Sequence, residues 1–278
     1  MSRDPQPPVQ PIRLLEVDLD GTTVDHEGRI SPRVLEALRA AMVRGVWVSV
    51  ATGRNLPSAR PFAERIGINA PLLCLQGGMV YDLQRERVLR HVTLPHALSC
   101  ELVEVVRAYP EWKPVVYQDN RIYINDAAFF AGIQTLIGFQ PILAEDLCAV
   151  LQARDTDKVL FRVPPEDAPR ALETLRAHVG ERALVMQSHA IFVEVTPLGA
   201  DKGTALQWLA NYLGVPRAQV MAIGDQDNDA TMIAWAGLGV AMGNAPEPVK
   251  ALAAWVAPSI DEDGAAVAIE RFVLNHDL

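Results

Sequence analysis

The feature of this 278-residue chain that most limits its fold is a regular alternation of strand-like and helix-like segments. Residues 12–19 form an apolar run typical of a buried strand, and a helical pattern follows for which Ser31 is the expected N-cap. The order repeats as a strand over 46–50, a helix over 57–66 and a strand over 71–75. Such repeats need right-handed crossovers, so they predict an α/β fold with a doubly wound, Rossmann-like parallel sheet.

The alternation is interrupted in the middle of the chain. Residues 86–195 contain several strand-like segments, including two that a turn at Tyr117–Arg121 is expected to join as a hairpin. After residue 196 the α/β order returns, with a helix that Asp201 is expected to cap and a strand over 220–223. We therefore predict three parts: a flexible tail (1–11), a core domain (12–85 and 196–278) and an inserted α+β cap domain (86–195).

Composition excludes several classes of function. Half of the residues are hydrophobic and 21% are charged, which is typical of a globular protein, and the formal net charge is −9. That charge argues against nucleic acid and anionic membranes as partners. The sequence contains no stretch of 18 apolar residues, so no membrane span is predicted. Three cysteines without metal-ligand spacing fit a reducing cytoplasm. Only four of the 25 basic residues are lysines, which makes each of their positions worth inspecting: Lys113, Lys158, Lys202 and Lys250.

Four short polar segments stand at predicted strand ends or at a helix start, where open α/β sheets bind their ligands. These segments are Asp18-Leu-Asp20-Gly-Thr22, Thr52-Gly53-Arg54, Lys202, and Gly224-Asp225-Gln-Asp-Asn228-Asp229. The side chains of Asp18 and Asp20 can point to the same side of an extended chain. Together with Asp225 and Asp229 they form an anionic cluster that a cation would relieve, and the all-oxygen ligand set favours Mg²⁺.

The remaining polar groups suit a phosphate ester. Lys202 offers a point charge and Thr52 a neutral donor for a phosphoryl group. An aspartate beside the cation can attack phosphorus as a nucleophile. A second acid two residues further on can protonate the leaving oxygen and later activate water.

These motifs resemble those of the haloacid dehalogenase superfamily of phosphohydrolases, most closely the Cof-type members of subfamily IIB. The resemblance follows the chain in order through Asp18–Thr22, Ala51–Arg54, Asp201–Gly203 and Gly224–Asp229, and the long insert resembles the cap of that subfamily. Each motif alone is weakly specific, whereas all four in order are strongly specific.

The resemblance implies a role for each matching residue. It makes Asp18 the nucleophile that forms an aspartyl-phosphate and Asp20 the general acid and base, which also lends its backbone carbonyl to Mg²⁺. It implies that the phosphoryl group is bound by Thr52, Gly53, Lys202 and Asn228. It implies that the metal is held by Asp18, Asp20, Asp225 and Asp229, with Asn228 and Asp229 supporting the site.

Six further residues are weaker candidates for contacts with the substrate or for support of the site: Arg54, Gln76, Gly77, Arg121, Tyr123 and His189. Three positions depart from the family pattern. Thr23 replaces a usual leucine, which we expect to change packing more than chemistry. Glu16 should lie on the Asp18 side of its strand and add negative charge, and Gln76 replaces an asparagine that orders the site.

The predicted function is Mg²⁺-dependent hydrolysis of phosphate monoesters of small metabolites, with sugar phosphates as the expected class. Two alternatives stay open. A phosphohexomutase would return the phosphoryl group from the same aspartate to a substrate, and a phospho-acceptor or binding protein would hydrolyse it only weakly. The sequence leaves the oligomeric state open.

Overall fold

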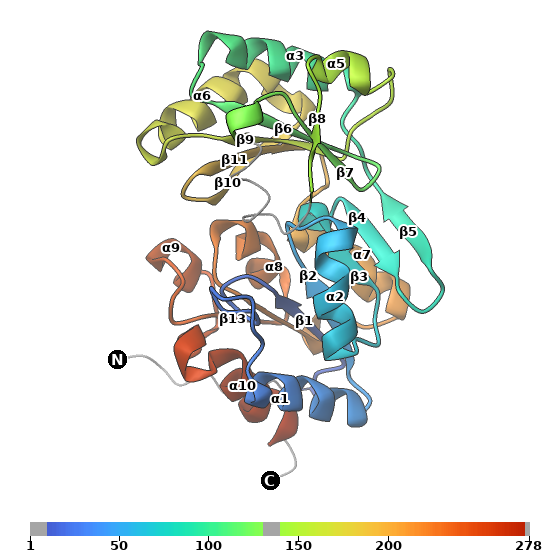
Figure 1. The fold of residues 1–278 in the computed structure, drawn as a ribbon. Coiled ribbons are helices and arrows are strands. Elements are labelled where there is room, and N and C mark those ends of the chain that lie inside the picture. Colours follow the sequence, from blue (N-terminus) through green and yellow to red (C-terminus); the bar gives the residue numbers. More distant parts are fainter. Residues whose placement is uncertain (1–9, 130–139, 276–278) are drawn as a thin grey trace.

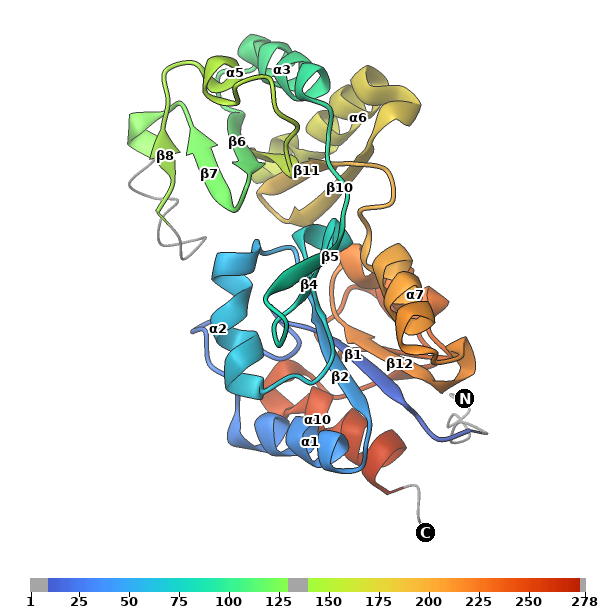
Figure 2. The same ribbon diagram turned by 90° about the vertical axis from the view of Figure 1, so that its right-hand side faces the viewer.

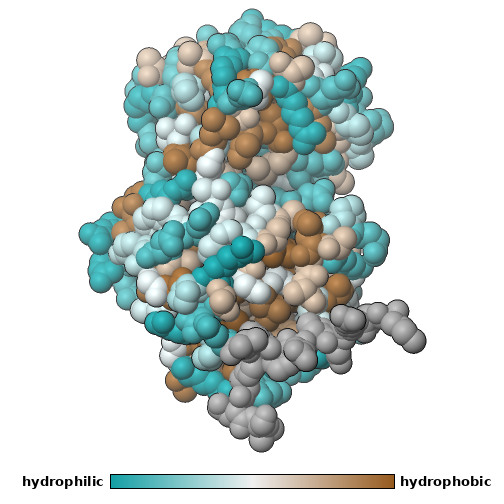
Figure 3. All heavy atoms as spheres, turned by 180° about the vertical axis from the view of Figure 1, so that it is seen from behind, coloured by the Kyte–Doolittle hydropathy of each residue, from teal (hydrophilic) through white to brown (hydrophobic). Residues whose placement is uncertain are grey.

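The computed structural model describes residues 10–129 and 140–275, so residues 1–9 of the predicted tail lie outside the described part. The described residues form two units, each built on its own β-sheet (Figure 1). In space-filling view from behind, the outline narrows between the two units (Figure 3).

The first, here called the core unit, has an eight-stranded sheet. Its strands, in spatial order, are β14 (Trp255–Val256), β13 (Leu238–Ala241), β12 (Val220–Gly224), β1 (Leu14–Asp18), β2 (Trp47–Ala51), β3 (Leu72–Cys74), β4 (Met79–Asp82) and β5 (Arg87–His91). Neighbouring strands from β14 to β3 pair in parallel, whereas β4 and β5 extend the edge in antiparallel pairing. The chain runs outward from β1 on one side and from β12 on the other, which confirms the predicted doubly wound fold.

Helices cover both faces of this sheet. The six helices of the core unit are α1 (Pro32–Val43), α2 (Leu56–Ile66), α7 (Lys202–Leu213), α8 (Ala230–Trp235), α9 (Glu247–Lys250) and α10 (Gly264–Ile269). Leu15 and Val17 of β1 pack in the cluster that includes α1, α2 and α10, whereas Leu14 packs in the cluster that includes α7, α8 and α9. The alternation of side chains along β1 therefore sends Asp18 toward the α7 side.

Local sequence signals set the helix ends that matter for the site. The predicted caps are confirmed: the Val34 N–H donates to Ser31 Oγ at 3.1 Å, and the Thr204 N–H donates to Asp201 Oδ1 at 2.9 Å. Gly214 ends α7 with a left-handed backbone conformation (φ 65°). Asp201 thereby fixes the start of α7, and with it the position of Lys202.

The second unit, here called the cap unit, has a six-stranded sheet. Its strands, in spatial order, are β10 (Leu184–His189), β11 (Phe192–Thr196), β9 (Lys158–Arg162), β6 (Lys113–Gln118), β7 (Arg121–Ile124) and β8 (Ile142–Leu143). Three helices lie on the face of the sheet away from the core unit (Figures 1 and 2): α3 (His96–Val105), α5 (Leu147–Val150) and α6 (Ala168–Val179). The other face is directed toward the core unit. The predicted hairpin is present between β6 and β7, with positive φ at Asp119 and Asn120.

The prediction that the insert begins at residue 86 was wrong for one strand. β5 pairs with β4 and so completes the sheet of the core unit. Arg90 of β5 stands where the chain leaves for the cap unit and returns from it. Its guanidinium donates to the carbonyl of Gly77 at 2.8 Å and to that of Gly199 at 2.9 Å.

Among the described residues, no helix has both the length and the apolar character needed to cross a bilayer.

Candidate active site

The four sequence motifs meet at one edge of the core sheet. Asp18 ends β1, Thr52 follows β2, Asp225 follows β12, and Lys202 begins α7. β1 and β12 are adjacent strands at the point where the chain direction across the sheet reverses. Open α/β sheets form their binding crevices at such a point, so the topology itself brings these side chains together.

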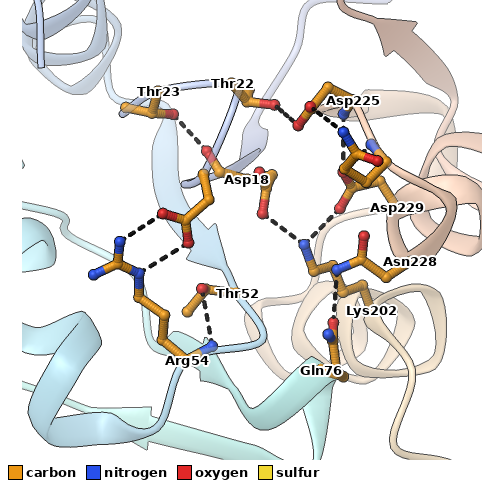
Figure 4. A network of polar contacts seen from close by, with 12 residues as sticks. Asp18, Thr22, Thr23, Thr52, Arg54, Gln76, Lys202, Asp225, Asn228 and Asp229 are labelled. Carbon is orange, nitrogen blue, oxygen red and sulfur yellow. Dashed lines mark hydrogen bonds and ion pairs between the residues drawn. The ribbon is translucent and has the colours of Figure 1, made fainter. Parts of the chain in front are cut away.

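Lys202 lies between two carboxylates (Figure 4). Its Nζ donates to Asp18 Oδ1 at 2.6 Å and to Asp229 Oδ1 at 2.5 Å, and its side chain has no exposed surface. Burial acts to lower the pKa of Lys202, but the charges of Asp18 and Asp229 outweigh it and raise that pKa. The two carboxylates therefore favour the charged ammonium form of Lys202 within the site.

Asp18 is buried among like charges. Burial, followed by the charge of Asp229, raises the pKa of Asp18 well above its ordinary value, and the charge of Lys202 acts in the opposite direction. One ammonium thus faces more carboxylates than it can balance. The deficit of positive charge lies at the predicted nucleophile.

Asp225 is held by three donors. Thr22 Oγ1 donates to its Oδ1 at 3.0 Å, while Gln226 Nε2 and Asn244 Nδ2 donate to its Oδ2 at 3.0 and 3.1 Å. Burial and the charge of Asp229 raise the pKa of Asp225 to about 6. Gly21 makes this arrangement possible, because a Cβ at that position would lie 2.4 Å from Asp225 Oδ2.

The carboxylates suit a hard divalent cation. Asp18, Asp225 and Asp229 each offer an oxygen, and these three oxygens lie within 4.8 Å of one another. The raised pKa values of Asp18 and Asp225 mark a charge excess that a cation would relieve. Both oxygens of Asp229 already accept hydrogen bonds: Oδ1 accepts from Lys202, and Oδ2 accepts the backbone N–H groups of Asp225 and Gln226 at 2.8 and 3.0 Å.

Asp20 stands apart from this cluster. The guanidinium of Arg54 donates to both of its carboxylate oxygens, at 2.9 and 2.5 Å, and is itself 4.6 Å from the centre of the Phe62 ring. The side chain of Asp20 is 54% exposed. Arg54 therefore positions a solvent-accessible carboxylate beside the buried one of Asp18.

The loop after β2 is tied to the loop after β3. Thr52 is buried and its Oγ1 accepts the Arg54 N–H at 3.1 Å. Asn228 Nδ2 donates to Gln76 Oε1 at 2.9 Å, so Gln76 joins the support of the site although it replaces the family asparagine. Gly53 leaves room for Gln76, because a Cβ there would lie 2.5 Å from Gln76 Nε2. Gly77, by contrast, packs against Asp201 and Ala205 at the start of α7.

The two remaining departures from the family pattern lie close to Asp18. Thr23 Oγ1 donates to the Asp18 backbone carbonyl at 2.5 Å, so it fixes the nucleophile loop in addition to filling space. Glu16 lies on the Asp18 side, as predicted, and is completely buried. Burial raises the pKa of Glu16 to about 8 despite a hydrogen bond from Ser49, so it is largely neutral at pH 7. The expected negative charge from Glu16 is thus mostly absent.

A cleft of about 660 Å³ lies between the two units and reaches this site. Asp18, Asp20, Arg54 and Gln76 line it from the core unit, and the predicted His189 lines it from the cap unit. The volume fits a small metabolite. Carboxylates outnumber lysines and arginines along its walls: Asp18, Asp20, Asp25, Glu27, Glu194 and Asp225 stand against Arg54 and Lys158.

Two of the weaker candidates for substrate contacts, Arg121 and Tyr123, lie away from the cleft. Tyr123 is buried in the hydrophobic cluster beneath the cap helices, and Arg121 is exposed at the start of β7. Neither residue lines the cleft, whereas Ile122 between them does. Side chains alternate along a strand, so the hairpin was identified correctly but the face was not.

Sequence reasoning also missed contributors. Asn244 follows the end of β13 at the same sheet edge, a signal equal to that of the other motifs. Lys158, Glu194, Ser188 and Tyr117 all line the cleft from the cap unit. For Lys158, the rarity of lysine in this chain was the one available signal.

Comparison with known proteins identifies the family. Residues 15–269 match the family model of the haloacid dehalogenase-like hydrolases. The chain belongs to this family. The predicted superfamily is therefore confirmed over nearly the whole described chain.

Several curated relatives of this haloacid dehalogenase-like hydrolase are named as phosphatases. It is 33% identical over 242 residues to the HMP-PP phosphatase of Serratia proteamaculans, covering 86% of this chain and 87% of the relative. It is 29% identical over 272 residues to the putative phosphatase YxeH of Bacillus subtilis, covering 94% and 98%. These relatives confirm the prediction of a phosphatase-type enzyme.

Solved structures share the fold. A haloacid dehalogenase-like hydrolase from Bacteroides thetaiotaomicron is 29% identical, with a TM-score of 0.83 over 94% of this chain and 99% of that chain. The subclass IIB sugar phosphatase BT4131 is 23% identical, with a TM-score of 0.80 over 94% and 98%. The two-unit architecture is thus shared with the predicted subclass.

Proposed function

We propose that this hydrolase cleaves phosphate monoesters of small metabolites with the help of Mg²⁺, through an aspartyl-phosphate at Asp18. One observation carries the proposal. Asp18 lies at the floor of a metabolite-sized cleft, in contact with the buried Lys202, while the accessible carboxylate of Asp20 is held beside it by Arg54. A nucleophile, an anion-binding cation and an acid–base group are what such a hydrolysis needs.

The residues divide the reaction between them. The Asp18 carboxylate attacks phosphorus as the ester bond breaks, and Asp20 gives its proton to the leaving oxygen. A water then attacks the aspartyl-phosphate and gives its proton to Asp20, which releases phosphate and restores Asp18. We assign Thr52, Gly53, Lys202 and Asn228 to holding the phosphoryl group.

Mg²⁺ would be held by Asp18, Asp225 and the backbone carbonyl of Asp20, with Asp229 close by. When bound, it would supply the positive charge that a phosphate needs in an acidic cleft. The two basic side chains that line the cleft are already paired, Arg54 with Asp20 and Lys158 with Glu194. They leave the charge of a phosphate uncompensated, which supports a role for the cation. Asp229 accepts hydrogen bonds at both oxygens, so we assign it mainly to positioning Lys202 and the Asp225 loop.

We propose sugar phosphates as the substrate class. The cleft offers polar pairs beside apolar walls from Ile122, Leu160 and Phe192, a mixture that suits a hydroxylated ring. Relatives named as an HMP-PP phosphatase and as a sugar phosphatase support a small phosphorylated metabolite as substrate. A cytoplasmic location is proposed from the cysteine content alone.

Release of inorganic phosphate from a panel of sugar, nucleotide and cofactor phosphates tests the proposal. We expect activity with Mg²⁺, none with a chelator, and none in Asp18→Asn. The matched control is Asp227→Asn, which removes an exposed acid from the same region and should leave turnover unchanged. Normal turnover in Asp18→Asn would refute the mechanism, and phosphoryl return to a second substrate hydroxyl would replace the hydrolase with a mutase.

A further inference from the structure

A second buried lysine faces the cleft from the cap unit. Lys158 of β9 has a side chain that is only 2% exposed, and its Nζ donates to Glu194 Oε2 of β11 at 2.6 Å. The same Nζ lies 4.7 Å from the centre of the Tyr117 ring. The opposite oxygen of Glu194 accepts a short hydrogen bond from Ser188 Oγ. Within the cap unit, this ammonium is already neutralised and well packed.

Lys158 nevertheless reaches out of its own unit. Its Nζ also donates to the backbone carbonyl of Gly53 at 2.9 Å, and Gly53 belongs to the core unit. A hydrogen bond from a charged donor is among the stronger contacts available to a backbone carbonyl, and this one is partly buried. The contact therefore joins the two walls of the cleft.

The residue that Lys158 contacts lies in a sensitive loop. Gly53 lies between Thr52, which we assign to phosphate binding, and Arg54, whose guanidinium donates to both carboxylate oxygens of Asp20. Gln76 lies against Gly53, because a Cβ at Gly53 would come within 2.5 Å of Gln76 Nε2, so the loop has little free space on that side. A displacement of the Gly53 carbonyl therefore also shifts the adjacent residues Thr52 and Arg54.

We propose that Lys158 is a positioning residue that couples closure of the cap unit to the ordering of the 52–54 loop. The inference rests on the proposed function for its catalytic consequence, but its structural part stands on the Lys158–Gly53 contact alone. When the cap unit moves away, the Gly53 carbonyl loses its donor, and the middle of the loop is then held only by the core-unit hydrogen bonds of Thr52 and Arg54 on either side. When it closes, one ammonium fixes the loop that presents Thr52 and Arg54.

This role differs from direct recognition of the leaving group. A lysine that only contacted the leaving group would affect each substrate according to that group. A lysine that orders the 52–54 loop affects every phosphate ester alike, because the loop acts on the phosphoryl group and on Asp20. The difference can be measured with substrates that share nothing but the phosphate.

The test uses a variant in which the buried Lys158–Glu194 ion pair is replaced by uncharged side chains that still fill the space. Removing Lys158 alone would leave Glu194 buried without its counter-ion, so both are changed in Lys158→Met/Glu194→Gln, which retains the acceptor for Ser188. The matched control is Lys113→Met/Asp126→Asn, which removes another lysine–carboxylate pair of the cap unit, at 2.8 Å and away from the cleft. Both proteins are compared with the wild type by hydrogen–deuterium exchange and by steady-state kinetics.

We expect amide exchange across residues 52–56 to rise roughly tenfold in the first variant and to stay unchanged in the control. We expect KM for p-nitrophenyl phosphate and for acetyl phosphate to rise by the same factor, with kcat within about twofold, because saturating substrate can still select the closed form. Unchanged exchange at 52–56, or an equal change in the control, would overturn the proposal. So would a KM effect that depends on the leaving group. Should the wild type lack phosphatase activity, the exchange result still decides the coupling.

Discussion

The two units each bury a lysine beside the cleft, but they surround it differently. Lys202 in the core unit contacts two carboxylates, with Asp225 nearby, whereas Lys158 in the cap unit contacts one carboxylate and one carbonyl. The core cluster is therefore short of positive charge and the cap cluster is balanced. A shortage of positive charge prepares a site to take up a cation and then a phosphate, whereas a balanced pair resists both.

After the loss of activity expected for Asp18→Asn, the largest expected effect in the core unit is that of replacing Asp20. Asp20→Asn keeps the shape of the side chain but removes the proton carrier, so turnover should fall by roughly 10²–10⁴. Stability should change by less than about 1 kcal/mol, since the Asp20–Arg54 pair is partly exposed. Steady-state kinetics and urea unfolding check both values. Turnover within twofold of the wild type would remove Asp20 from the chemistry.

The balanced cap pair should respond to a single substitution through stability. Glu194→Gln leaves the Lys158 ammonium buried without its counter-ion and should cost about 3–5 kcal/mol in the free energy of unfolding. Lys158→Met/Glu194→Gln should recover most of that loss. Asp18→Asn, which removes one of several crowded carboxylates, should not destabilise the metal-free protein at all. A destabilisation by Asp18→Asn as large as that by Glu194→Gln would erase the contrast between the two clusters.

The charge shortage also predicts a response to Mg²⁺. A ligand that binds the folded state alone stabilises it by about 2.7 kcal/mol at 100 times its Kd. Thermal unfolding should therefore shift upward with Mg²⁺ in the wild type and much less in Asp225→Asn. Asp227→Asn, whose acid is exposed in the same region, should keep the full shift. An equal shift in all three proteins would place the cation elsewhere.

The last prediction concerns the pH dependence of stability that Glu16 causes behind Asp18. In the unfolded chain Glu16 loses its proton near its ordinary pKa of 4.5, but in the folded protein its pKa is about 8. The folded state thus holds the extra proton between these values, and its stability falls as pH rises through that window, by up to about 1.4 kcal/mol per pH unit. Glu16→Gln should remove this component. Urea unfolding at pH 5.5 and 7.5 measures it, and an identical slope in wild type and variant would contradict the buried neutral state.

Much of the fold and the motif positions followed from sequence. Strands of a parallel sheet end at one edge, so polar residues after residues 18, 51 and 224 had to meet there, and the structure brings them together. Their chemical roles stay predictions. The β5 assignment failed because an antiparallel extension of the sheet leaves no local pattern that separates it from the insert.

The cap unit was less accessible to sequence reasoning. The choice between Tyr123 and Ile122 depends on which face of a strand meets the cleft, and a shift of one residue reverses it. Lys158 contacts a residue 105 positions away in the chain, which no spacing rule reveals. The sequence could not show which residues of each cap strand face the core unit.

Arg90 has a mechanical consequence for the molecule. The chain enters and leaves the cap unit at two crossings, and this one guanidinium clasps the carbonyls of Gly77 and Gly199 beside them. Arg90 thus ties the segment that returns from the cap unit, at Gly199, both to the strand from which the chain leaves and to Gly77 of the core unit. Movement of the cap unit has to be accommodated in the few connecting residues beyond this junction.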